Sequence, residues 1–336
     1  MEHTDLLVFW PTTRCNLKCR YCYARAQEQG EDMDWEIVHD FLEQFKNRHV
    51  KVQFAGGEPL LRPDLIWKTA DYLRREKPDT VIQLQTNGTR ITKEIAERIR
   101  DFGIRVGVSL DGLPELNEYQ RGYTREALWG IKILGDAGIP VGINAVLTNR
   151  SIQALPRLAD LALMYPNIRG IALDLLRLSG RARIDKDLEL PGSDEIDVNF
   201  RALYERCKKI GRIRGVPLVL REVEDAKMRL LHPSKAGLHC YASLGRSFVI
   251  LPDGTCYPCG SLTGKPQYQL SEEKNFRFPA LQVSEKDSCK TCTWREWCDR
   301  GCPARDISNG PNGREAECAL RRAAFALAKM EIEENN

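Results

Sequence analysis

The chain has 336 residues, enough for one large or two ordinary domains, each with its own hydrophobic core. Its net charge of +3 is small for this length and comes without a block of basic residues, so nucleic acid is not an expected partner. The 12 cysteines occur without a signal peptide, and no apolar run is long enough to span a membrane. We therefore expect a cytoplasmic protein, with no membrane partner, whose cysteines bind metal.

The first half of the sequence alternates apolar strands with helices. Six strands are expected, at 6–10, 50–54, 81–85, 104–110, 139–147 and 168–176. The helices between them are expected at 35–48, 65–75, 93–102, 125–137 and 152–164. This alternation predicts an α/β fold with a parallel sheet and helices outside it.

Three cysteines follow the first strand within eight residues: Cys15, Cys19 and Cys22. Three thiolates can hold three irons of a four-iron, four-sulfur cluster and leave the fourth iron open for an outside ligand. A structural zinc site would need a fourth Cys or His close by, and the nearest histidines are His3 and His39. The spacing therefore favours an iron–sulfur cluster with catalytic chemistry over a structural zinc site.

The CxxxCxxC spacing, with Tyr21 just before the last cysteine, resembles the signature of the radical S-adenosylmethionine (SAM) superfamily. The turn Gly56, Gly57, Glu58 and Pro59 after the second strand resembles the family's turn for the methionine amino group of the cofactor. The resemblance implies a partial, TIM-like (β/α)6 radical SAM barrel over residues 1–190, with its chemistry at the carboxyl ends of the strands. It also implies SAM bound to a 4Fe-4S cluster that the three cysteines hold, which makes them the catalytic residues.

Polar residues at other strand ends are candidates for cofactor contacts. Asn87 and Asp111 stand before glycines, and such pairs are also ordinary turn formers. Ser109 is a further candidate, and Asn144 lies within an apolar run, where a buried amide needs a partner. Arg177 precedes a Gly-Arg-Ala segment that resembles one in peptide-modifying members. It is expected either to pair a carboxylate at the barrel mouth or, preferably, to be exposed on the surface.

Residues 191–237 are expected to form a linker with a bridging helix at 195–212, in which Cys207 is a small buried hydrophobe. The last 99 positions, 238–336, contain a dense set of cysteines and end in a helix expected at 316–333. The cysteine spacing resembles the SPASM extension of radical SAM enzymes at seven positions. These are Cys240, Cys259, Cys289, Cys292, Cys298, Cys302 and Cys318.

This second resemblance implies a small SPASM domain with two auxiliary iron–sulfur clusters. By the family's connectivity, Cys240, Cys259 and Cys302 hold the first cluster, and the other four cysteines hold the second. The first cluster lacks one ligand from the motif, and Cys256 either supplies it or is packed in place of an apolar residue. The second serves as an electron conduit or a structural brace, with zinc as the minority alternative.

Together the motifs imply an oxidoreductase that reductively cleaves SAM to a 5′-deoxyadenosyl radical, which takes hydrogen from a substrate carbon. The expected function is oxidative crosslinking of a ribosomally made peptide or protein, with electrons from a reductase such as flavodoxin or ferredoxin. Because no leader-binding domain precedes the first strand, the leader-binding protein is expected to be a separate chain, unless the substrate is a folded protein or a small molecule. The alternative is oxidative modification or decarboxylation of a small molecule such as a tetrapyrrole precursor. A non-enzymatic electron carrier would not explain the Gly-Gly-Glu-Pro turn.

Overall fold

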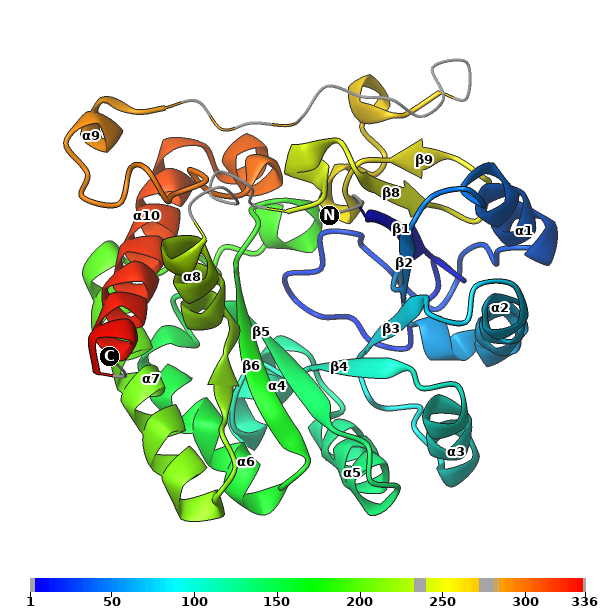
Figure 1. Ribbon diagram of the computed structural model, residues 1–336, viewed down its shortest axis with the longest axis horizontal. Coiled ribbons are helices and arrows are strands. Elements are labelled where there is room, and N and C mark those ends of the chain that lie inside the picture. Colours follow the sequence, from blue (N-terminus) through cyan, green and yellow to red (C-terminus); the bar gives the residue numbers. More distant parts are fainter. Residues whose placement is uncertain (1–3, 233–239, 272–280, 282, 284, 335–336) are drawn as a thin grey trace.

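The computed structural model describes residues 4–232, 240–271, 281, 283 and 285–334. In this part of the chain the strands form one curved sheet of nine, in the order β7-β6-β5-β4-β3-β2-β1-β8-β9 (Figure 1). All neighbours pair in parallel except β8 and β9, which are antiparallel. The strands are β1 (Asp5–Phe9), β2 (Val50–Phe54), β3 (Val81–Thr86), β4 (Arg105–Ser109), β5 (Val141–Leu147), β6 (Ile168–Leu175), β7 (Val219–Leu220), β8 (Ser247–Ile250) and β9 (Cys256–Tyr257). The α/β fold class and the six expected strands are confirmed.

Most of the helices lie on the outer face of the curved sheet, and a short one, Asp287–Lys290, lies away from it (Figure 1). They are α1 (Trp35–Gln44), α2 (Pro63–Glu76), α3 (Lys93–Asp101), α4 (Pro114–Gln120), α5 (Thr124–Asp136), α6 (Leu161–Met164), α7 (Ser193–Arg214), α8 (Arg221–Leu231), α9 (Asp287–Lys290) and α10 (Pro303–Glu334). The α-helix expected at 152–164 is wrong over most of its length, since Ile152–Asp160 is a 3-10 helix. Pro156 lies inside it and has no backbone N–H to donate, which disfavours a regular α-helix there.

The closing helix starts earlier than the sequence predicts. It begins at Pro303 and is interrupted at Gly310, whose φ of 61° and ψ of −151° are not helical, and Pro311 follows. The second part contains the expected helix and packs on α7 and α8, with Ala323 and Leu327 buried. The part of α10 before Gly310 therefore follows the cysteine-rich segment, and the part after it packs in the outer helical layer.

The segments after β6 add strands to the barrel sheet. In the expected linker, β7 pairs with β6 beyond α7. On the other side, β8 pairs with β1 in parallel, with Leu7 opposite Phe248. These strands have two and four residues, too few for a period-two pattern to be recognised in the sequence. The expected domain boundary between residues 237 and 238 lies outside the described residues.

Alternation along the strands separates the helix-facing side chains from those inside the curve. In β5, Val141, Ile143, Ala145 and Leu147 are buried, whereas Asn144 lies on the opposite face of the strand. Because successive side chains point to opposite faces, the polar residues of β3, β4 and β5 share the inner face. This face forms the wall of the candidate site.

Candidate functional site

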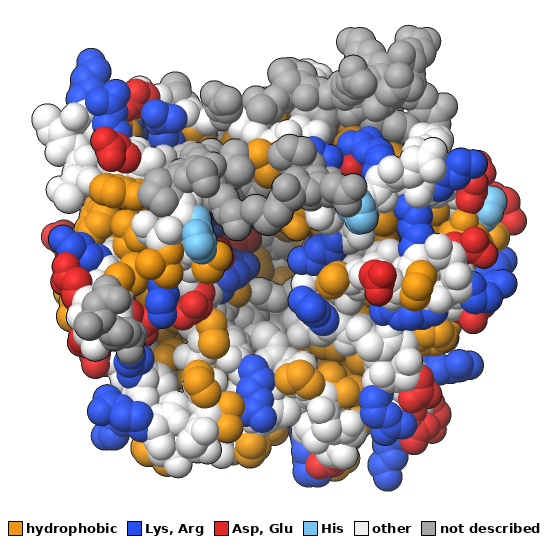
Figure 2. All heavy atoms as spheres, in the orientation of Figure 1, with side chains coloured by type: hydrophobic (Ala, Val, Ile, Leu, Met, Phe, Trp, Pro, Cys, Tyr) orange, Lys and Arg blue, Asp and Glu red, His pale blue; other side chains and the backbone are white. Residues whose placement is uncertain are grey.

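The inner face of the sheet encloses a cavity of about 630 Å³. It is lined by the Cys15–Cys22 loop, the Gly56–Glu58 turn and the carboxyl ends of β3 to β6. The first turns of α8 and part of α10 complete the wall. Figure 2 shows the hollow in the centre of one face, with Lys and Arg side chains at its rim. The expected position of the chemistry, at the carboxyl ends of the strands, therefore coincides with a cavity of a size usual for small ligands.

The cysteine loop is folded back on itself by an ion pair. Arg14 donates to both carboxylate oxygens of Asp32, at 2.9 and 2.6 Å. The Thr12 hydroxyl donates to the same carboxylate at 2.6 Å and accepts a hydrogen bond from the Arg14 backbone N–H at 3.0 Å. These contacts close the loop and fix the path that carries Cys15 into the cavity.

The glycine turn packs directly against this loop. The Gly57 N–H donates to the Thr12 carbonyl at 3.1 Å, and the Glu58 N–H donates to the Arg14 carbonyl at 2.8 Å. A Cβ on Gly57 would lie 1.9 Å from the Arg14 carbonyl oxygen, so no side chain fits there. Gly56 has a φ of +117°, which is strained for other residues. The sequence predicts that the backbone of this turn lies close to the cofactor. In the structure, the Gly57 backbone lies against the cysteine loop.

Glu58 and Asn87 join the ends of β2 and β3. The Glu58 carboxylate accepts hydrogen bonds from the Thr86 hydroxyl at 2.7 Å and from the Asn87 N–H at 2.8 Å. Burial raises the pKa of Glu58. The Asn87 amide donates to the Asn16 side chain at 3.0 Å, next to Cys15. Both residues therefore position the loops that carry the site, and their contact with a cofactor stays a prediction.

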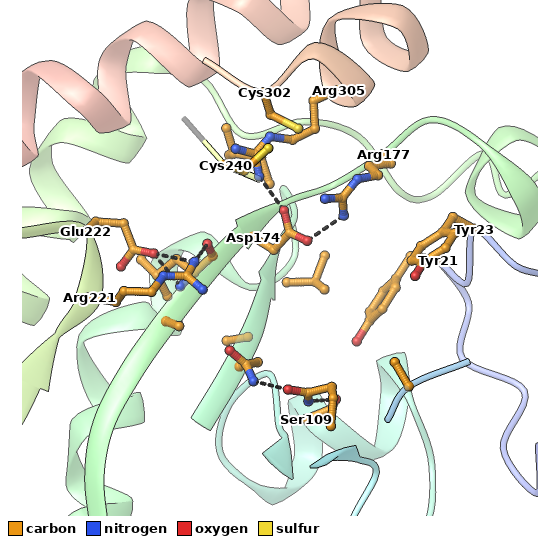
Figure 3. A pocket seen from close by; sticks show the side chains of 18 of the residues that line it. Tyr21, Tyr23, Ser109, Asp174, Arg177, Arg221, Glu222, Cys240, Cys302 and Arg305 are labelled. Carbon is orange, nitrogen blue, oxygen red and sulfur yellow. Dashed lines mark hydrogen bonds and ion pairs between the residues drawn. The ribbon is translucent and has the colours of Figure 1, made fainter. Parts of the chain in front are cut away.

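Ser109 and Asn144 belong to a polar floor that also includes Gln85. The Gln85 amide donates to the Ser109 hydroxyl at 2.9 Å, and its oxygen accepts from the Asn144 amide (Figure 3). Gln85 and Asn144 meet across β4 because Gly107 stands between them. A Cβ there would lie 2.5 Å from the Gln85 oxygen and 2.7 Å from the Asn144 nitrogen. The floor presents these side chains to the cavity, as expected for cofactor contacts.

Tyr21 connects the cysteine loop to the fourth strand end. Its hydroxyl donates to the Asp111 carboxylate at 2.5 Å and accepts from Arg121. Asp111 also accepts from the Val146 N–H at 2.9 Å and the Gln120 amide at 3.0 Å. The Asp111 carboxylate thus accepts three hydrogen bonds from within the protein and acts on the site through Tyr21. Arg121, which sequence reasoning missed, lines the cavity.

The Gly-Arg-Ala segment clamps the other side of the cysteine loop. Arg181 donates from its side chain to the carbonyls of Cys19, at 2.7 Å, and Ala26, at 2.9 Å. Its backbone N–H donates to the Cys22 carbonyl at 3.0 Å. A Cβ on Gly180 would lie 2.3 Å from that carbonyl oxygen, so this close contact requires glycine. A role in holding the loop could not be read from the sequence, because the two segments are more than 150 residues apart.

The fold gathers the ligand cysteines of the described residues into groups. Burial, together with the nearby Cys19 and Cys22 thiols, raises the pKa of Cys15 to about 12. Burial also raises the pKa of Cys259, with the Cys302 and Cys240 thiols close enough to contribute. In the middle of α10, Cys318 lies close to both Cys289 and Cys298. The Cys292 N–H donates to the Cys289 carbonyl at 3.1 Å. These proximities are compatible with the expected cluster connectivity, which stays a prediction.

Cys256 lies apart from these groups. It is 1% exposed and packs in the main hydrophobic core, on β9, whereas Cys259 lines the cavity. Cys207 is likewise buried in the core, on α7. The position of Cys256 supports the packed alternative over ligation.

Arg177 is not a surface residue. Its side chain is 16% exposed, pairs with Asp174 and lines the cavity, so the preferred surface role is wrong (Figure 3). Burial raises the pKa of Asp174, but the guanidinium groups of Arg177 and Arg305 outweigh burial and lower this pKa to about 2. The sequence does not single out Asp174, because a polar residue between buried ones is ordinary in a β-strand. It does not single out Arg305, because the ion-pair partner Asp174 is distant in sequence.

The donor groups fit iron–sulfur clusters. Buried and half-buried thiols that are close together are suitable ligands, which lose their protons when metal binds. Among the described residues, no three His, Cys, Asp or Glu side chains are close enough to hold one metal ion. Thiolates of a four-iron cluster each bind a different iron and so stand farther apart than the ligands of one ion.

Comparisons with known proteins agree with this site. The model of the Radical SAM superfamily matches residues 11–162. Mycofactocin maturase MftC of Mycobacterium tuberculosis is 33% identical over an alignment of 349 residues, which covers 95% of this chain and 83% of that protein. This chain belongs to the radical SAM superfamily. Its C-terminal cysteines place it in the SPASM subfamily, as their spacing predicts.

Two further similarities are to a curated relative and to a solved structure. Fe-coproporphyrin III synthase of Methanosarcina barkeri is 32% identical over 236 residues, 67% of this chain and 56% of that protein. The structure of anSMEcpe with bound AdoMet and Cp18Cys peptide has a TM-score of 0.79 and 19% identity, and covers 99% of this chain and 100% of that chain. The latter confirms the radical SAM fold over the whole chain.

As a radical SAM enzyme, the protein uses SAM and a 4Fe-4S cluster, and SPASM members carry auxiliary clusters in addition. The enzyme class expected from the sequence is thus confirmed. Within the described residues, no helix combines the length and apolar character needed to cross a membrane.

Proposed function

We propose that the protein is a maturase that oxidatively crosslinks a ribosomally made peptide or protein. The observation that carries the proposal is the shared cavity: Cys15, Cys19 and Cys22 line it from the loop after β1, and Cys240, Cys259 and Cys302 line it from the C-terminal region. A substrate placed between these two thiol groups would have the site of hydrogen removal on one side and an acceptor for the remaining electron on the other. The similarity to MftC supports a peptide as the substrate.

In this proposal the first three cysteines hold the cluster at which SAM is bound. The bound cofactor supplies a 5′-deoxyadenosyl radical, and the protein orients both reactants and excludes water. The Gln85, Ser109 and Asn144 floor would orient the cofactor, with Gly56 to Pro59 and Asn87 fixing the loops above it. Arg121 and Asp111 hold Tyr21, which keeps the loop closed over the site.

The cavity volume limits what can enter. At about 630 Å³ it has the size of an ordinary small-ligand pocket. Beside a bound cofactor it would therefore admit one side chain or a short extended segment, and most of a peptide would remain outside. A separate leader-binding protein would recognise that outer part, and a flavodoxin or ferredoxin would supply electrons.

The test is co-expression of the protein with candidate precursor peptides, followed by mass spectrometry and quantification of 5′-deoxyadenosine. We expect loss of two hydrogens from one peptide, with 5′-deoxyadenosine formed in proportion. Cys19→Ala is the control, and should abolish both signals while the C-terminal clusters keep their iron. A Cys19→Ala protein that forms 5′-deoxyadenosine at the wild-type rate would contradict the assignment of the cluster.

A second candidate is oxidative decarboxylation of a tetrapyrrole precursor. The similarity to Fe-coproporphyrin III synthase favours it, although that similarity covers less of both chains. In the cavity, Arg221 has a side chain that is 53% exposed and offers a guanidinium group to a substrate carboxylate. Incubation with coproporphyrin-type substrates decides between the two, because decarboxylation removes carbon dioxide whereas crosslinking removes two hydrogens.

A further inference from the structure

A continuous row of ion pairs lies along the wall of the cavity and reaches the cysteine-rich region, and all of its members except Asp299 line the cavity. We call this row the charge chain. In order it contains Arg177, Asp174, Arg305, Glu317, Arg321, Asp299 and Arg229. Each member is paired with the next, and Figure 3 shows one end of the row, where Asp174 lies between Arg177 and Arg305.

The middle of the charge chain is the most enclosed part. The Arg305 Nε lies 2.7 Å from Glu317 Oε2, and the Arg321 Nη2 lies 2.9 Å from Glu317 Oε1. Asp299 is paired with Arg321 and Arg229, at 2.5 Å each. The side chains of Arg305, Glu317 and Asp299 are 10%, 7% and 0% exposed. These charges are held in a low-dielectric interior, where their fields reach nearby groups with little screening.

The charge chain passes beside both auxiliary cysteine groups. In sequence, Asp299 directly follows Cys298, and Glu317 directly precedes Cys318. In space, Arg305 is close enough to Cys302 to interact with its thiol, and Arg321 is close enough to Cys298. The row therefore connects the two groups of proposed ligands, which belong to different clusters.

Stability alone is a weak reason for such an arrangement. Buried ion pairs lose hydration on folding, and apolar residues of similar volume often stabilise a protein as well or better. Four guanidinium groups and three carboxylates leave the charge chain with one net positive charge. An excess of positive charge beside thiolate-bound iron favours the more negative, reduced form of a cluster.

We propose that the charge chain sets the reduction potentials of the two auxiliary clusters, with Arg305 raising that of the first and Arg321 that of the second. Asp299 opposes Arg321 and lowers the potential of the second cluster. The inference rests on the cluster assignment of the proposed function. Its consequence is that both clusters become better acceptors for the electron that a substrate radical gives up. Arg305 and Arg321 are then positioning residues, which act through the clusters, so their effect on the potentials is expected without substrate present.

The experiment measures midpoint potentials of the reconstituted full chain by redox titration followed by electron paramagnetic resonance, without substrate. Arg321→Gln should shift the second cluster to a more negative potential, and Asp299→Asn should shift it to a more positive one. The double variant should lie between them, since it removes one charge of each sign. Arg305→Gln should shift the first cluster to a more negative potential, and Arg305→Lys, which keeps the charge, should shift it less.

Arg48→Gln is the matched control. It removes an arginine that pairs with the buried Asp5 at the amino-terminal edge of the sheet, so it should leave all potentials unchanged. General damage to packing would not produce shifts of opposite sign for Arg321→Gln and Asp299→Asn. If Arg321→Gln loses the second cluster, Asp299→Asn still decides the sign there, because it removes the opposing charge.

Two outcomes distinguish failure of this inference from failure of the proposed function on which it rests. If the auxiliary clusters assemble with full iron and neither Arg321→Gln nor Asp299→Asn moves a potential, the charge chain is structural and the inference is wrong. If the unaltered protein assembles no auxiliary cluster, the proposed function is itself contradicted, and the inference is overturned with it.

Discussion

Gly57 illustrates how a single residue fixes the site. The turn and the cysteine loop touch at this point, and a Cβ would meet the Arg14 carbonyl oxygen at 1.9 Å. The sequence predicts a glycine needed for contact with the cofactor, whereas the structure shows one needed for contact between two parts of the protein. Both purposes require backbone without a side chain, so the motif alone does not distinguish them.

Gly57→Ala should therefore displace the cysteine loop rather than only obstruct the cofactor. We expect less iron at the first cluster and a loss of 5′-deoxyadenosine formation of about 100-fold, as for a misplacement of about 1 Å in an active site. Iron analysis and 5′-deoxyadenosine assays check this. Wild-type iron content combined with weakened SAM binding would instead support the simpler role in cofactor contact.

Cys256 is a second residue at which packing decides the role. Because its side chain is enclosed in the hydrophobic core, Cys256→Val should change the free energy of unfolding by less than about 1.5 kcal/mol. Iron per chain should stay at the wild-type value, whereas Cys259→Ala should lower it. Denaturant unfolding and iron analysis are the measurements. An altered spectrum of the first auxiliary cluster in Cys256→Val would identify Cys256 as a ligand after all.

At the scale of elements, a single glycine in β4 allows side chains of the two neighbouring strands to touch. The Gln85 and Asn144 side chains, on β3 and β5, meet over β4 at Gly107. Alternation along three parallel strands brings these groups to one face, and their register aligns Ser109 with Asn144. The polar floor is therefore a property of the sheet and not of any one motif.

Gly107→Ala should separate Gln85 from Asn144 and weaken SAM binding about tenfold, the effect of losing one or two well-placed hydrogen bonds. Gly142→Ala, on the adjacent strand β5, is the matched control, because no atom lies within 4 Å of a Cβ there. Calorimetric titration with SAM measures both. Equal affinities for the two variants would show that the floor does not contact the cofactor.

The 3-10 helix Gly180–Arg183, which follows β6, is a second element that holds the cysteine loop although it is distant from that loop in sequence. Arg181→Gln should release the carbonyls of Cys19 and Ala26, which a shorter amide cannot reach together. We expect a more oxygen-sensitive first cluster and unchanged auxiliary clusters. Arg183→Gln, in the same segment but exposed, should match the wild type. The measurement is the rate of bleaching in air; identical rates for both variants would exclude a clamp at Arg181.

At the scale of the whole molecule, the C-terminal region extends the barrel sheet and brings its own thiols to the same cavity. Because β8 pairs with β1, the chain from Cys240 onward is attached next to the strand that carries the cysteine loop. A Cys240→Ala, Cys259→Ala double variant should still cleave SAM but give no crosslinked product, since only the proposed electron acceptor is removed. Product analysis beside 5′-deoxyadenosine assays tests this, and a full yield of product with the first cluster intact would exclude an electron-handling role.

The sequence by itself determined the family and the barrel strands, and it identified the candidate ligand cysteines. These features depend on local spacing: three thiols within eight residues share a loop, and apolar runs of five to nine residues form buried strands. The glycine turn and the SPASM cysteines are also recognised by spacing. For the same reason, the sequence identified the residues of the floor as strand-end candidates without showing what they contact.

Only the tertiary structure decided which of these residues meet. Arg177 turned out to be enclosed, Cys256 to be packed, and Arg181 to hold the cysteine loop, because each depends on segments far away in the sequence. The charge chain likewise connects β6 with α8 and α10 through partners up to 131 residues apart. Ion pairs and burial arise when distant elements pack together, and no short-range pattern encodes them.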